Sequence, residues 1–173
     1  MSTGQAFVFI NVKQAARFGH VGWGFALGYG QDQYFFGATD HLIRHRWWNL
    51  GGWLAYSRVA PGAEVDWWGE TGNRDQMMQS MSPPQASRQR YHIWYHYAKA
   101  IDVSQAQPEK ALALAQALET GGWSVTDNNC VQQSYRVLSA YGAELPPVSS
   151  NPLSWLPKPW FARIHGEIIR LPV

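Results

Sequence analysis

The one cysteine of the chain, Cys130, lies in a context that favours a reactive thiol. The polar run 126–129 precedes it and an amphipathic run, 131–141, follows it, so the pattern predicts that Cys130 lies in the first turn of a helix. Free amides and the positive end of the helix dipole favour a thiolate there. Such a position can lower a thiol pKa by more than about one unit. Cys130 is therefore a candidate nucleophile; the alternative is a buried structural cysteine.

A cysteine hydrolase also needs an imidazole that shares the thiol proton, a polar group that orients the imidazole, and an oxyanion hole. Among the six histidines we select His20, which opens an expected strand and is followed by small residues that would let a helix dock closely. The alternative is a strand histidine bonded to a backbone carbonyl. The backbone amide of Cys130, at a helix N-terminus, is the expected oxyanion donor. Asn129 and Trp23 are further oxyanion or substrate-binding candidates.

The element that must position His20 is a β-hairpin. Strands are expected over 20–27 and 33–39, joined by a turn over 28–32. If this turn centres near Gly30 and Gln31, the residue across from His20 falls near Asp40 or His41. Either side chain could hydrogen-bond the imidazole, and a one-residue slip in register exchanges their faces. Asp40 would stabilise an imidazolium better because it is charged.

The remaining pattern predicts an α+β fold in one domain spanning residues 1–173, with an antiparallel sheet packed against the cysteine helix. Strands are expected over 7–12, 64–68, 91–103 and 167–171, and helices over 75–81, 107–118 and from Cys130 to Gly142. The proline-rich segment that follows Pro146-Pro147 is expected to wrap over the surface before the last strand.

With these features the chain resembles the circularly permuted papain-like cysteine hydrolases, which include permuted NlpC-type peptidases and lecithin:retinol acyltransferase-like enzymes. The matching segments are 20–24 (HVGWG), 37–40 (GATD) and 128–131 (NNCV), with His20 lying 110 residues before Cys130. The resemblance implies a papain-like fold, with Cys130 as nucleophile and His20 as base. It covers the hairpin and the cysteine helix, and it leaves residues 42–90 unmatched.

Composition narrows the class of protein. With 46% hydrophobic and 15% charged residues, the chain reads as globular, and a net charge of +2 without a basic run argues against nucleic-acid binding. A lone cysteine excludes an intramolecular disulfide. We expect no signal peptide and no membrane span, and therefore a cytoplasmic protein, with signal-independent export as an effector left open.

Two pairs of histidines at i, i+4 spacing, His41 with His45 and His92 with His96, could suggest a metal site. Neither has a cysteine or carboxylate at diagnostic spacing, so we expect solvated or interface histidines, no metal and no cofactor. The chain's 10 tryptophans fit a core or a groove that binds a glycan or peptide. The pairs Trp47-Trp48 and Trp67-Trp68 should each place adjacent side chains on different faces.

The sequence thus predicts a hydrolase of amide bonds, a cysteine peptidase or amidase that acts on a peptide or on peptidoglycan through a thioester acyl-enzyme. Acyl transfer by the same thioester is an alternative, although the chain shows no basic amphipathic helix that would meet a membrane. The other alternative is a catalytically silent papain-like module that binds a glycan or peptide in a tryptophan-lined groove. An antibacterial effector acting on cell-wall peptides also fits. The oligomeric state is not indicated.

Overall fold

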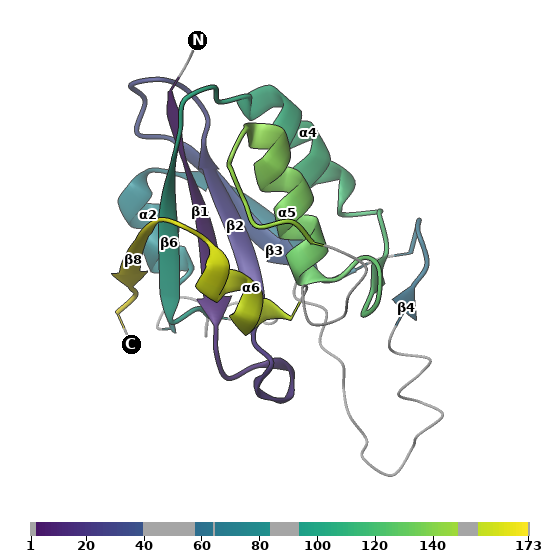
Figure 1. The fold of residues 1–173 in the computed structure, drawn as a ribbon. Coiled ribbons are helices and arrows are strands. Elements are labelled where there is room, and N and C mark those ends of the chain that lie inside the picture. The colour runs from purple at the N-terminus through teal and green to yellow at the C-terminus, as the bar shows by residue number, and fades with distance from the viewer. Residues whose placement is uncertain (1–2, 40–57, 64, 84–93, 149–155, 173) are drawn as a thin grey trace.

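A six-stranded antiparallel sheet is the centre of the described fold (Figure 1). The structure is a computed structural model that describes residues 3–39, 58–63, 65–83, 94–148 and 156–172. The strands lie in the order β5-β3-β2-β1-β6-β8. Their bounds are β1 Gly4–Asn11, β2 His20–Ala26, β3 Tyr34–Thr39, β5 Trp67–Gly72, β6 Tyr97–Val103 and β8 Glu167–Arg170. Two short strands, β4 (Arg58–Val59) and β7 (Trp123–Ser124), form a separate pair.

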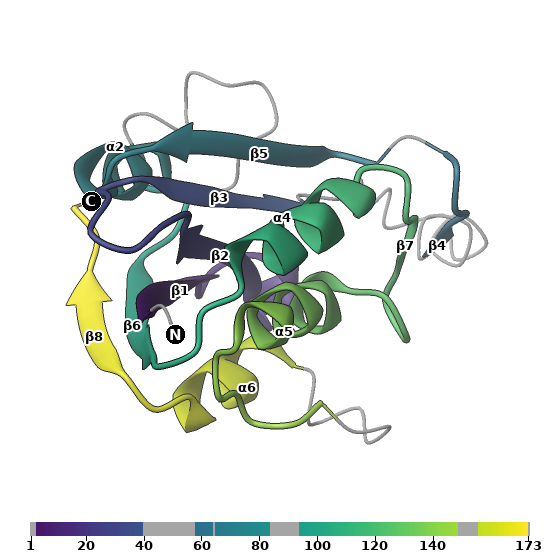
Figure 2. The same ribbon diagram turned by 90° about the horizontal axis from the view of Figure 1, so that it is seen from above.

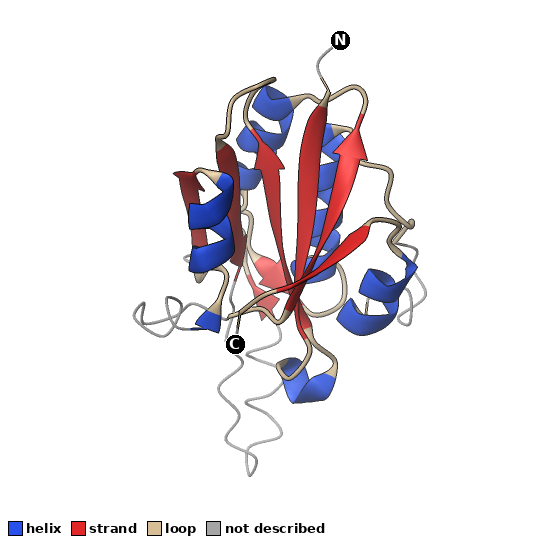
Figure 3. Ribbon diagram, turned by 90° about the vertical axis from the view of Figure 1, so that its left-hand side faces the viewer, coloured by secondary structure: helices blue, strands red, loops and turns tan. Residues whose placement is uncertain are grey.

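Helices pack on both faces of this sheet (Figures 2 and 3). In the described residues they are α2 (Arg74–Ser80), α4 (Pro108–Ala117), α5 (Cys130–Tyr141) and α6 (Pro157–Arg163), with a short 3₁₀ turn, η1 (Ala15–Arg17), before β2. Helices α4, α5 and α6 lie on one side of the sheet and α2 on the other (Figure 2). The predicted α+β class is therefore confirmed.

Alternation along β2 assigns its side chains to the two faces. Phe25 packs on Tyr141 of α5, with ring centroids 5.2 Å apart. Its neighbour Gly24 faces α2, because a Cβ built there would lie 2.8 Å from the sulfur of Met77. We call these the α5 face and the α2 face. Both are apolar, which explains why all seven residues of β2 are buried.

The hairpin of β2 and β3 has the register expected from the sequence. Trp23 lies opposite Gly37 and Ala26 lies opposite Tyr34, so the turn is centred on residue 30. On its other side β2 pairs with β1, and Asn11 lies opposite His20. The hairpin therefore holds His20 at the first position of a central strand.

Most of the predicted elements are present, and the bounds of some are shifted. The strand expected over 64–68 is found as β5, Trp67–Gly72, and the one expected over 91–103 starts at Tyr97 within the described residues. Helix α6 was not predicted, because its prolines at 157 and 159 suggested a surface strap. Proline is tolerated in the first turn of a helix, where the amides have no intrahelical partner, and α6 begins with Pro157.

Candidate active site

Asn129 builds the start of the cysteine helix. Its side-chain oxygen accepts hydrogen bonds from the amides of Val131 (3.0 Å) and Gln132 (3.2 Å). The Gln132 side chain accepts in return from the Asn129 amide at 2.9 Å, which completes a capping box. The side-chain nitrogen of Asn129 donates to the carbonyl of Val125 at 2.9 Å. Helix α5 therefore begins at Cys130, as the sequence predicts, and ends at Tyr141, where Gly142 caps it with a left-handed φ of 107°.

Asn128 fixes the loop that leads into this helix. Its side-chain nitrogen donates to the carbonyls of Gly121 (3.1 Å) and Gly122 (2.8 Å). Its oxygen accepts from the guanidinium of Arg136, one and a half turns along α5. The buried side chain of Gln133 adds a bond to the Gly122 carbonyl at 3.2 Å. Both asparagines before Cys130 thus hold the nucleophile candidate in a rigid loop–helix junction.

The structure brings His20 and Cys130 together, because β2 and α5 start at the same end of the sheet. Burial raises the pKa of the Cys130 thiol. The charge of His20, a hydrogen bond from its side chain, and hydrogen bonds from the backbone amides of Val21 and Val131 lower it by more. The net pKa of Cys130 is below its ordinary value. This combination favours a thiolate–imidazolium pair.

The pair is well shielded from solvent. Cys130 is 9% exposed and His20 is 8% exposed. A low local dielectric strengthens the attraction between a thiolate and an imidazolium, and it makes an unpaired charge costly. The thiolate form of Cys130 therefore depends on the charge and the hydrogen bond of His20.

The amide of Cys130 lies outside the cap. Asn129 engages the amides of Val131 and Gln132, and the amide of Gln133 starts the helical hydrogen bonds by donating to the Asn129 carbonyl at 2.9 Å. The Cys130 N–H is thus the helix-terminal donor that the capping box does not use. Its place beside the sulfur suits a developing oxyanion.

The other predicted site residues are Asn129, Trp23, Asp40 and His41. Both ends of the Asn129 side-chain amide are engaged in the junction. Trp23 is 1% exposed and packs against Phe35 on the α5 face, with centroids 5.5 Å apart. Substrate contact by either residue remains a prediction. Asp40 and His41 lie outside the described residues.

Among the predicted groove tryptophans, Trp67 and Trp68 occupy β5. Trp68 lies opposite Ala38 and its ring meets Phe36 edge-on at 6.3 Å, while Trp67 lies opposite Thr39. Adjacent side chains therefore point to different faces, as expected for a strand. Trp47, Trp48 and Trp53 lie outside the described residues.

The histidine pairs give no metal cluster within the described part of the chain, where no three metal-ligating side chains gather. His41, His45 and His92 fall outside it. His96 is buried, and its Nδ1 accepts a hydrogen bond from the Val12 amide at 3.3 Å. This bond anchors the end of β1.

One contact of His20 and one of the turn before it were not predicted from the sequence. The ring of Tyr95 stacks on the His20 imidazole, with centroids 6.0 Å apart and planes 26° from parallel. The turn before His20 also rests on α6, because the Lys158 amide donates to the Phe18 carbonyl at 3.3 Å. Buried Lys99 holds the other end of α6 by donating to the carbonyls of Phe161 (3.0 Å) and Ile164 (2.6 Å).

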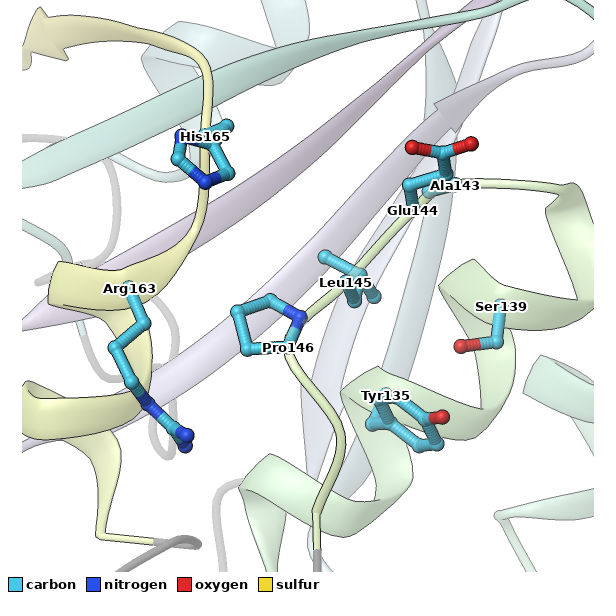
Figure 4. Close-up of a pocket in the computed structure, with 8 residues that line it drawn as sticks. All are labelled: Tyr135, Ser139, Ala143, Glu144, Leu145, Pro146, Arg163 and His165. Carbon is cyan, nitrogen blue, oxygen red and sulfur yellow. The ribbon is translucent and has the colours of Figure 1, made fainter.

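A shallow cavity of about 540 Å³ lies apart from these residues (Figure 4). It is formed by the outer side of α5, the segment after it, and the end of α6. Its lining residues are Tyr135, Ser139, Ala143, Glu144, Leu145, Pro146, Arg163 and His165. None of them belongs to the pair of His20 and Cys130, so the cavity is a different surface feature.

No protein-family model, curated protein or solved structure matches this chain significantly. In the residues that the structure describes, no helix is both long and apolar enough to cross a membrane. The contact between His20 and Cys130 is therefore the feature that points to a function.

Proposed function

We propose that the protein is a papain-like cysteine hydrolase of amide bonds, with Cys130 as nucleophile and His20 as base. The observation that carries the proposal is the buried hydrogen bond and charge interaction between the His20 side chain and the Cys130 thiol at the start of α5. A helix-borne cysteine beside a strand-borne imidazole supplies an activated nucleophile and a proton carrier.

The reaction follows from these two groups. His20 takes the thiol proton, and the thiolate of Cys130 attacks the carbonyl carbon of the amide. The oxyanion that forms accepts a hydrogen bond from the Cys130 amide. The imidazolium then gives its proton to the leaving nitrogen as the C–N bond breaks, which leaves a thioester. Water, deprotonated by His20, attacks the thioester and releases a carboxylic acid and the free thiol.

The substrate class proposed is a peptide or the peptide part of peptidoglycan. Support comes from the sequence resemblance and from the antiparallel sheet packed on the cysteine helix. The third catalytic residue is proposed to be Asp40 or His41. Acyl transfer would use the same thioester with a nucleophile other than water, and product analysis separates the two outcomes.

Alkylation by iodoacetamide tests the activated thiol without a known substrate. The rate should be measured from pH 5 to pH 10, with the site identified by mass spectrometry. We expect Cys130 to react rapidly below pH 8 and Cys130→Ala to abolish the reaction. His20→Ala should shift the profile to that of an ordinary thiol, about pH 8.5, while His165→Ala, at an exposed histidine, should leave it unchanged.

A second experiment tests hydrolysis itself. Purified peptidoglycan fragments and a mixed peptide library are incubated with the protein, and new amines and acyl adducts on Cys130 are sought by mass spectrometry. An adduct that disappears in Cys130→Ala supports the proposal. If wild-type Cys130 alkylates only above pH 8 and His20→Ala changes nothing, the enzyme proposal is wrong, and a silent binding module is the better description.

A further inference from the structure

The His20 imidazole is packed against an aromatic ring contributed from far along the chain. Tyr95 has no exposed surface, and its ring stacks on His20 with a centroid separation of 6.0 Å. It also packs on Phe9 of β1 at 5.9 Å. Separations of roughly 4.5–7 Å are typical of favourable aromatic pairs. The imidazole therefore rests on a ring that is itself fixed in the core.

Gly22 provides the space for this ring. A Cβ built at Gly22 would lie 2.8 Å from the Tyr95 hydroxyl oxygen and 3.0 Å from the Gly37 carbonyl oxygen. The distance to Tyr95 is shorter than real Cβ atoms show and the distance to Gly37 is tighter than most, so glycine at position 22 lets Tyr95 approach β2 this closely. Gly22 is two residues after His20, on the same side of the strand.

Backbone contacts hold Tyr95 in place on both sides. The Tyr95 amide donates to the carbonyl of Met81 at 2.9 Å, and the next amide, of His96, donates to Ile10 at 2.8 Å. The carbonyl before Tyr95 accepts from the side chain of Asn11 at 2.5 Å. Asn11 is the cross-strand partner of His20. The same pair of strands that carries the imidazole therefore also holds its aromatic support.

We infer that Tyr95 is a positioning residue that restricts the His20 imidazole to the orientation in which it meets the Cys130 thiol. This role rests on the proposed function, because its value lies in keeping base and nucleophile aligned. Small errors in such alignment are costly in catalysis. The inference assigns this task to the ring that stacks on His20, so phenylalanine, which keeps the ring, should preserve the orientation and an aliphatic residue should not.

The inference is tested with four variants and two readouts. The variants are Tyr95→Phe, Tyr95→Leu, Gly22→Ala and Gly24→Ala. The last is a matched control, because the nearest atoms to a Cβ at Gly24 are the sulfur of the flexible Met77 side chain at 2.8 Å and atoms of Phe36 and Phe9 at 3.3 Å, and none of them belongs to Tyr95. The readouts are the pH profile of Cys130 alkylation and the NMR signal of the His20 Cε1 proton, assigned by its absence in His20→Ala. Thermal melting checks that each variant is folded.

We expect Tyr95→Phe and Gly24→Ala to keep alkylation at pH 6.5 within about twofold of wild type and to keep the imidazole signal in place. Tyr95→Leu and Gly22→Ala should slow alkylation about tenfold, which corresponds to a thiol pKa about one unit higher, and should shift the His20 signal. A folded Tyr95→Leu variant with the wild-type alkylation profile and the wild-type His20 signal would overturn the inference. An equal loss of alkylation rate in Tyr95→Phe and Tyr95→Leu would overturn it as well.

The two readouts separate this inference from the proposed function. If wild-type Cys130 behaves as an ordinary thiol, the proposed function fails, and the NMR signal still reports whether Tyr95 orients His20. If wild-type Cys130 is activated by His20 but no Tyr95 variant alters either readout, the dyad stands and the positioning role is wrong.

Discussion

Replacing Asn129 by alanine should both destabilise the protein and weaken the reactivity of Cys130. The change removes the acceptor for the amides of Val131 and Gln132 and the donor to the Val125 carbonyl. Loss of an N-cap costs about 1 kcal/mol. Loss of a further bond at a side chain that is 6% exposed adds about 1–2 kcal/mol. The expected total is about 2–3 kcal/mol.

A matched control exists elsewhere in the chain. Asn73 caps α2 with the same capping box, since its side chain accepts from the Gln76 amide at 2.8 Å. This cap is exposed and is not next to the thiol. Asn73→Ala should therefore cost only about 1 kcal/mol and leave Cys130 unchanged.

The assay combines thermal denaturation with the pH profile of Cys130 alkylation. For a chain of this length, 1 kcal/mol corresponds to about 2–4 °C in melting temperature, so Asn129→Ala should melt about 4–12 °C lower and Asn73→Ala about 2–4 °C lower. Fraying of the first turn of α5 should also slow Cys130 alkylation at pH 6.5 about tenfold, which corresponds to a thiol pKa about one unit higher. Asn129→Ser, which keeps the acceptor, should fall between wild type and alanine. Equal destabilisation at both caps, or unchanged thiol reactivity in a folded Asn129→Ala, would refute the reasoning.

Three other outcomes are expected. The pKa of His96 is lowered by burial and by nearby Lys13, so its neutral form stabilises the fold above about pH 6.5. The melting temperature of the protein should therefore fall as the pH drops below this value. The variant His96→Asn should show a smaller fall. Burial raises the pKa of Tyr141 to about 12, so stability should be lost as pH rises from about 10 through that value, and Tyr141→Phe should remove this loss. Asp40→Asn should slow Cys130 alkylation more than His41→Ala does; the reverse order would make His41 the orienting residue.

The parts of the site that depend on local sequence could be predicted. Helix α5 was placed correctly because Asn129 and Gly142 are strong signals for a helix start and end. The hairpin register followed from its turn residues. In each case the residues that determine the structure are neighbours in the sequence.

The parts of the site that depend on contacts between residues far apart in the sequence could not be predicted. The glycine at 22 suggested a close approach, but its partner Tyr95 is contributed from 73 residues further along. The helix at Pro157–Arg163 is stabilised by Lys99 from β6, a contact that local propensity does not report.

The contact between α6 and the turn before His20 has a consequence for protein synthesis. The Phe18 carbonyl and the Lys158 amide that bonds to it are 140 residues apart in the sequence. At a translation rate of about 5–20 residues per second, the second group is made about 7–28 s after the first. During that interval the strand that carries His20 can pair with β1 while its leading turn has no support from α6. The arrangement of His20 beside Cys130 should therefore be completed late, after Cys130 has already been made.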